Sequence, residues 1–232
     1  MSEGKRKVLL GRIREALRVP AQSHATRSAG KHSAPADGDQ TARDCLPSVP
    51  SDYAGRLALF RERSIQLKTG FHIVAGPEAA TATMSVLRDH HSWTSAAAHH
   101  HPLIDPIIES IGIDTVFVEE RPETKALERC SVGITGCDAL IAQTGSILVT
   151  SRSAGGRSLS VLPPHHVVLA TPDQLLADLP EAFELLRLKY RDRYPSFAGL
   201  ITGPSRTGDI ERILVLGAHG PRNLTIILVD RR

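Results

Sequence analysis

The sequence predicts an α/β domain with an open, mostly parallel β-sheet, helices on both faces of the sheet, and additional hairpin strands. Short apolar runs alternate with helical segments from Asp52 onward, which is the pattern of βαβ units. After Cys130, strand-like runs follow one another with only Gly, Ser and Pro between them, which indicates hairpins. The chain has 232 residues, enough to bury one sizeable core.

The first 50 residues differ from the rest. Apolar residues recur at helical spacing between Val8 and Leu17, with Lys and Arg between them, which predicts an amphipathic N-terminal helix within residues 1–19. Residues 20–50 contain only Leu46 and Val49 as large aliphatic residues. Such a segment buries too little apolar surface to offset its ordering entropy. We therefore predict a flexible linker over residues 20–50, ahead of an α/β domain over residues 51–232.

Within the domain, strands and helices alternate first and strands dominate later. Pro77 supports one helix start, because proline is tolerated in a first helical turn. The predicted helices cover residues 53–68, 77–90, 105–110 and 122–130, followed by a helical region over residues 172–190 that contains two prolines. The predicted strands are residues 71–75, 115–118, 132–135, 139–142, 146–150, 158–162, 167–170, 212–216 and 225–229.

Charge and hydropathy restrict the class of protein. Residues 1–50 carry nine Lys/Arg and five Asp/Glu, whereas the remainder carries 19 and 20. The domain is therefore close to neutral, which argues against a broad nucleic-acid surface. No apolar run approaches the roughly 20 residues of a membrane span, and charges interrupt the N-terminus too often for a secretory signal. We expect a cytoplasmic protein.

Cysteines and histidines give no metal-site spacing. Cys45, Cys130 and Cys137 are far from the tight runs that ligate iron–sulfur clusters or zinc. Of the five histidines between residues 90 and 101, only His99 and His101 have a spacing at which two strand residues share a face. We expect these histidines at a surface helix end and loop, with no metal or other cofactor bound by this chain.

The segment Thr202–Glu211 combines glycines, hydroxyl side chains and one arginine. Glycines allow close approach of the backbone to a ligand, and a guanidinium offers a planar fork to a carboxylate or phosphate. The two acids here oppose anion binding unless they face away or hold a divalent metal, and an ordinary loop explains the same residues. The candidate ligand-binding residues are Gly203, Ser205, Arg206 and Thr207, and the acids Asp209 and Glu211 are candidate catalytic groups.

Two earlier loops are further candidates. Gln143–Ser146 and Ser151–Arg157 each join two predicted strands. A tight turn explains the first and a hairpin connection the second, but two arginines at the shoulders of the second also suit a lid over an acidic substrate. The candidate ligand-binding residues here are Gln143, Thr144, Gly145, Arg152 and Arg157.

Three histidines lie at strand ends. His165 and His166 enter a strand, so their side chains point to opposite faces and one of them is expected near the site. His219 ends an apolar strand in the same way. His165 and His219 are candidate catalytic residues, and a structural histidine is the alternative for each.

Residues 202–230, TGPSRTGDIERILVLGAHGPRNLTIILVD, are similar to the C-terminal signature of the LUD domain family. The resemblance extends upstream through GITGCDALIAQTGSILVTS and SLSVLPPHHVVLA, and covers roughly residues 114–230 in order. It implies a fold like that of the ribose-5-phosphate isomerase and CoA-transferase group, with 5-formyltetrahydrofolate cyclo-ligase as a structural relative. Family members often carry Glu at the position of Gln143, so an acid–base role there would be lost in this chain.

The resemblance also implies a function. The first hypothesis is an accessory component, without an iron–sulfur cluster of its own, of a system in which iron–sulfur partner proteins oxidise L-lactate to pyruvate. It would bind a small carboxylate or phosphate in one hollow formed by all three candidate loops. The rival is an independent cyclo-ligase-like enzyme acting on a phosphorylated or nucleotide substrate. A third hypothesis is a protein-binding module that docks through its N-terminal helix.

Overall fold

A computed structural model describes residue 15 and residues 47–207, 215–216 and 220–230. The predicted N-terminal helix and the linker up to residue 46 lie outside this part, apart from Glu15, which is helical. Residues Ser48–Arg232 form one compact unit. In the part of the chain that the structure describes, no helix has the length and apolar character to cross a membrane.

The observed elements follow the predicted alternation. The helices are α3 (Tyr53–Leu67), α4 (Gly76–His91), α5 (Asp105–Ile111), α6 (Thr124–Arg129) and α7 (Leu179–Lys189), with 3-10 turns at Val118–Glu120 and Pro172–Gln174. The strands are β1 (Gly70–Ala75), β2 (Ser95–Ala98), β3 (Asp114–Phe117), β4 (Val132–Thr135), β5 (Ala139–Ile141), β6 (Ser146–Thr150), β7 (His165–Ala170), β8 (Leu175–Leu176), β9 (Ala198–Ile201), β10 (Arg206–Thr207), β11 (Val215–Leu216) and β12 (Asn223–Asp230).

Several expectations about these elements are wrong. The helical region expected over residues 172–190 begins with a 3-10 turn and strand β8, and becomes α-helical only at Leu179. Residues 158–162 form turns rather than a strand, because Val161 and Leu162 donate their backbone N–H groups locally to Ser158 O. Strand β2 was not predicted, because its three alanines have low strand propensity. All three are buried in the sheet, where small side chains fit between packed layers.

The main sheet has six strands in the order β1–β12–β7–β4–β2–β3, and every pairing in it is parallel. This confirms the predicted open parallel sheet. The likeness to the isomerase and transferase group stays a prediction.

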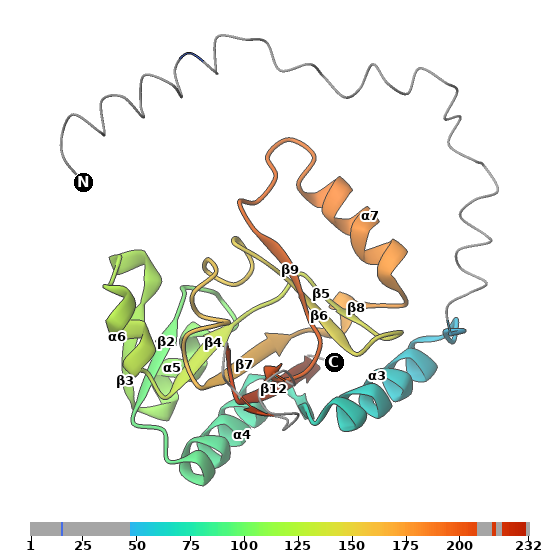
Figure 1. The fold of residues 1–232 in the computed structure, drawn as a ribbon. Coiled ribbons are helices and arrows are strands. Elements are labelled where there is room, and N and C mark those ends of the chain that lie inside the picture. The colour runs from blue at the N-terminus through green and yellow to red at the C-terminus, as the bar shows by residue number, and fades with distance from the viewer. Residues whose placement is uncertain (1–14, 16–46, 208–214, 217–219, 231–232) are drawn as a thin grey trace. The chain divides into compact units, whose positions relative to one another are not determined.

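Helices α4 and α5 cover one face of this sheet (Figure 1). Alternate residues of β7 and β12, such as Leu169 and Ile227, pack with Met84 of α4 and Ile107 of α5 in one apolar cluster. Their strand neighbours point the other way, as a period of two requires. Helix α6 packs beside β2 through Leu127.

The second face is covered mainly by a smaller sheet, in the order β8–β5–β6–β9. Strands β5 and β6 are antiparallel and connected by a tight turn, which confirms the predicted hairpin. Leu140 and Ile147 face the main sheet together with Phe60 of α3. Ile141 and Leu148 face the other way and pack against α7. The layers are therefore α4 and α5, the main sheet, the small sheet, and α7.

Candidate functional site

The carboxyl ends of β2 and β4 lie side by side in the main sheet. The chain leaves β2 toward the edge strand β3 but leaves β4 toward β7, in the opposite direction. Open parallel sheets bind their ligands at such a switch in direction, just beyond the carboxyl ends of the strands. This edge is therefore the position at which the fold favours a functional site.

His99 and Gly136 meet at this point. His99 follows β2 and Gly136 follows β4, and the Gly136 N–H donates to His99 Nε2 over 3.3 Å. Burial, followed by the neighbouring His101, lowers the pKa of His99. The expected surface position is wrong for His99, which is 3% exposed. It is buried because β2 is an interior strand and not a loop.

The glycine-rich segment Ser151–Arg157 covers the same edge. Gly155 has a φ of +62° and lies so close to β2 that an added Cβ would come within 2.4 Å of His99 Cβ. An added Cβ on Gly136 would lie 3.1 Å from Ser153 O. Glycine is thus required by packing here. The segment is not the predicted hairpin connection, since residues 158–162, the expected second strand, form turns.

This segment presents two of the predicted arginines beside aromatic rings. The Arg152 guanidinium lies 5.9 Å from the Tyr190 ring centroid, and that of Arg157 lies 5.1 Å from the Phe197 centroid. Arg152 Nη2 also donates to Arg193 O over 3.5 Å. Across the described residues, no ion pair joins Arg152, Arg157 or Arg193 to an acid. Adjoining segments therefore present three guanidinium groups without a compensating carboxylate.

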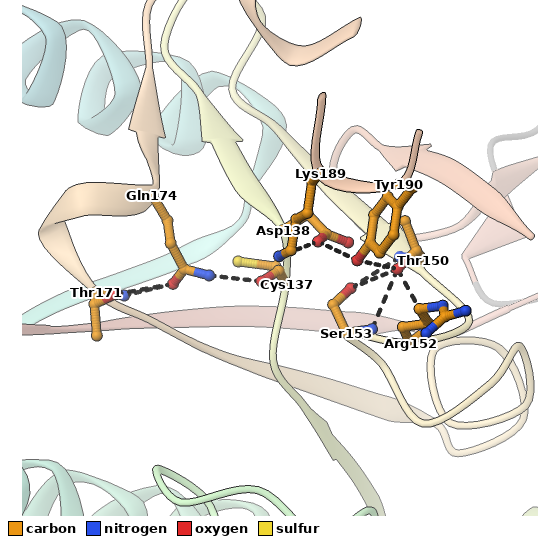
Figure 2. A network of polar contacts seen from close by, with 9 residues as sticks. All are labelled: Cys137, Asp138, Thr150, Arg152, Ser153, Thr171, Gln174, Lys189 and Tyr190. Carbon is orange, nitrogen blue, oxygen red and sulfur yellow. Dashed lines mark hydrogen bonds and ion pairs between the residues drawn. The ribbon is translucent and has the colours of Figure 1, made fainter. Parts of the chain in front are cut away.

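A buried carboxylate holds this region in place (Figure 2). Asp138 Oδ1 accepts hydrogen bonds from Lys189 Nζ and Tyr190 OH, both over 2.6 Å. The Thr150 hydroxyl lies 3.2 Å from Tyr190 OH and accepts from the backbone N–H of Ser153 over 3.2 Å. The network thus connects the C-terminal end of α7 to the start of the glycine-rich segment.

The pKa values define how this network is protonated. Burial alone would raise the pKa of Asp138, but hydrogen bonds from Lys189, Tyr190, Ser153 and Thr150 outweigh it, and the net pKa lies below its ordinary value. Burial and the bond to Asp138 raise the pKa of Tyr190. At neutral pH Asp138 is therefore a carboxylate and Tyr190 a phenol. The network therefore positions side chains through a carboxylate acceptor and a phenol donor.

Sequence reasoning did not identify this network. The available signal was Asp138 itself, a charged residue in the apolar run GCDALIA, since a buried charge requires partners. Those partners, Lys189 and Tyr190, are more than 50 residues away along the chain.

The other two candidate loops meet at the C-terminal end of α3. Ser146 Oγ and Thr202 Oγ1 are 2.8 Å apart. Gly145 and Gly203 both have positive φ and both pack against Leu67. Arg206 donates to Leu67 O. A cation at a helix C-terminus is favourable, so Arg206 has a structural contact here, and its ligand contact stays a prediction.

Gln143 and Thr144 belong to the same turn. Gln143 is buried, and its backbone N–H donates to Ala177 O over 2.9 Å. Thr144 Oγ1 is buried and has no hydrogen-bond partner among the described residues. Thr207 lies in β10, and its side chain is outside the described part.

That all three loops form one hollow stays a prediction, and two of the loops lie at opposite ends of β6. The Gln143–Ser146 turn precedes β6 and the glycine-rich segment follows it, so about 14 Å of strand separates them. Two loops converge at α3, while Arg152 and Arg157 lie at the other end of β6.

A cavity of about 210 Å³ lies next to the loop that contains Gly203 and Ser205. Gly203 and Ser205 line it, together with His166 and apolar side chains of the small sheet and β12. His166 is 1% exposed, and its Nε2 lies 2.8 Å from Thr135 Oγ1. Sequence reasoning favoured neighbouring His165 as a catalytic candidate.

His165 points to the opposite face of the main sheet, with Nε2 2.9 Å from Thr225 Oγ1. Burial lowers the pKa of both His165 and His166 to about 3. Such weak bases are poorly suited to proton abstraction at neutral pH, which favours the structural alternative. The candidates His219, Asp209 and Glu211 lie outside the described residues. Among the residues that the structure describes, no group of three or more His, Cys, Asp or Glu could hold a metal ion.

Comparison with known proteins agrees with this architecture. The family model of the LUD domain matches residues 78–229. Proteins called lactate utilization protein C are similar to this chain: that of Anoxybacillus flavithermus is 34% identical over 112 residues (48% of this chain, 50% of the relative). That of Deinococcus radiodurans is 35% identical over 122 residues (52% and 56%), and that of Bacillus subtilis is 29% identical over 146 residues (55% and 61%). The chain thus matches only about half the length of these relatives.

A solved structure shares the fold. The crystal structure of a duf162 family protein from Deinococcus radiodurans superposes with a TM-score of 0.62 at 25% sequence identity. The match covers 78% of this chain and 99% of that protein. The α/β architecture is therefore one already observed in an experimental structure.

Proposed function

This chain belongs to the LUD domain family, and from that premise we propose that it takes part in lactate utilisation as an accessory component without an iron–sulfur cluster. Its relatives named lactate utilization protein C support the pathway. We further propose that it binds a small carboxylate, such as lactate or pyruvate, at the glycine-rich segment Ser151–Arg157, and associates with iron–sulfur partner proteins that carry out the oxidation.

One observation carries the ligand proposal: the segment that covers the carboxyl edge of the main sheet presents arginines without acidic partners. A guanidinium presents two parallel N–H donors that match a carboxylate. Arg152 and Arg157 each lie beside an aromatic ring, which limits their conformational freedom before a ligand binds. Tyr190, under Arg152, is itself held by the buried Asp138.

Replacing the arginines should weaken carboxylate binding. We expect Arg152→Gln and Arg157→Gln each to raise the Kd for L-lactate or pyruvate about tenfold or more, because a hydrogen bond to a charged group contributes about 1.5–3 kcal/mol. Isothermal titration calorimetry measures this. Arg187→Gln is the control, since Arg187 is exposed on α7 and already paired with Glu184 over 2.5 Å. Unchanged affinity in both test variants would refute the site.

The partner proposal has a separate test. We expect the full chain, co-expressed under anaerobic conditions with the iron–sulfur proteins of a lactate-utilisation system, to co-purify with them and to increase lactate oxidation. No association, together with full lactate oxidation when the chain is omitted, would refute the role. The rival cyclo-ligase-like activity predicts thermal stabilisation by ATP or sugar phosphates, which would add about 2.7 kcal/mol at 100 times the Kd.

A further inference from the structure

We propose that a second cavity, at the amino-terminal edge of the main sheet, binds a planar, uncharged nitrogen heterocycle. The cavity has a volume of about 350 Å³ and lies where α4 and α6 end and β4, β7 and β12 begin. This volume is within the range of about 300–1,000 Å³ typical of small-molecule sites. Arg152 and Arg157 are not among its lining residues, so the site is independent of the proposed carboxylate site.

One wall of the cavity is aromatic. The rings of His91 and Trp93 are nearly parallel, with an interplanar angle of 10° and centroids 5.8 Å apart. His165 is nearly perpendicular to both, with centroids 4.6 Å from His91 and 5.0 Å from Trp93. Flat heterocycles associate with such rings by offset stacking and edge-to-face contacts.

The remaining lining is polar but carries no net charge. Ser131 and Asn223 supply neutral donors and acceptors, and the charges of Glu128 and Arg129 cancel. Burial lowers the pKa values of His91 and His165, so both rings are neutral at pH 7. A lining of this kind gives no preference to an anion or a cation and favours a ligand with both donors and acceptors.

His165 has an unmet hydrogen-bonding requirement at this wall. Its Nε2 is occupied by Thr225, while its Nδ1 is buried and has no hydrogen-bond partner among the described residues. Buried polar atoms in native proteins are almost always satisfied. Because Nδ1 itself is buried, a nitrogen heterocycle at this wall supplies the missing donor or acceptor only when the His165 ring turns toward the cavity.

The chain carries its own reporter for this site, because Trp93 is its only tryptophan. We expect titration of the full chain with adenosine or nicotinamide to give a saturable change in Trp93 fluorescence for at least one of these probes. L-lactate and inorganic phosphate should give none. No saturable change with either heterocycle, or an equal change with lactate or phosphate, would overturn the proposal.

Variants on the two faces of β7 locate the binding. We expect His165→Gln to weaken heterocycle binding at least tenfold by calorimetry, while His166→Gln, on the opposite face, changes it less than twofold. If His165→Gln does not fold, Asn223→Ala at the exposed rim replaces it, with at least threefold weakening expected. Equal effects of the two histidine variants, or no effect of Asn223→Ala, would overturn the proposal. Arg152→Gln should leave heterocycle binding unchanged. A negative result for the proposed carboxylate site can therefore be distinguished from a negative result for this cavity.

Discussion

Lowering the pH from 7 to 5 should reduce the free energy of unfolding by about 4 kcal/mol, because His165 and His166 are buried as neutral rings. Burial is the main cause of their pKa values of about 3, with His91 and His166 adding to the effect on His165. In the unfolded chain both would titrate near pH 6.5. Their contribution is therefore complete above about pH 6.5 and is lost as the pH falls toward 3, by about 1.4 kcal/mol per pH unit for each ring.

Urea unfolding at several pH values between 5 and 7 measures this slope. We expect His166→Gln to lower the free energy of unfolding at pH 7. We also expect it to remove about half of the pH dependence of that free energy that His165 and His166 cause together. The lowered pKa values of His72, His91 and His99 act in the same direction and remain in the variant. A slope identical in His166→Gln and the unaltered chain would contradict the assignment.

Asp138→Ala should destabilise the domain by about 3 kcal/mol at pH 7, since hydrogen bonds to a charged group contribute about 1.5–3 kcal/mol each. The substitution leaves Tyr190 OH buried without its carboxylate acceptor. The Lys189 side chain is 47% exposed, so water replaces the carboxylate as its partner. The loss of this ion pair therefore adds little to the destabilisation. Chemical unfolding at pH 7 measures the change.

The fall in the free energy of unfolding at acidic pH supplies a second measurement of the role of Asp138. Because the folded pKa of this carboxyl is lowered, its contribution is present above the unfolded value near 3.9 and is lost as the pH falls further, through the folded pKa. Asp138→Ala should remove this part of the acid dependence. Glu184→Ala, which breaks an exposed pair on α7, should leave stability almost unchanged. Equal effects of the two substitutions would argue against a buried network.

Much of the fold was predictable because its signals are local. The period of the apolar residues and the prolines at helix starts located α3, α4 and β4–β7 to within a few residues. The exceptions have local causes as well. β2 is built from alanines, whose burial is not visible in a polarity pattern, and residues 158–162 look apolar and extended although their backbone closes turns on Ser158.

The candidate site was predictable only in its residue types. Arg152, Arg157 and Gly155 were identified as a glycine-rich segment suited to an acidic ligand. The structure places Gly155 against His99 at the carboxyl edge of the main sheet, and the two arginines beside the rings of Tyr190 and Phe197. Their separation from Gly203 and Ser205 was not predictable, because it depends on β6 lying between them in a second sheet. The Asp138 network was not predictable because its partners Lys189 and Tyr190 are more than 50 residues away along the chain.

By itself, the sequence determined the family and the alternation of helices and strands, since the signals for both lie in residues close together in the chain. Only the tertiary structure decided that Asp138 meets Lys189 and Tyr190, that His99 is buried against Gly136, and that His165 and His166 serve different cavities. Strand order and register determine these contacts, and both result from packing the whole core rather than from any single segment.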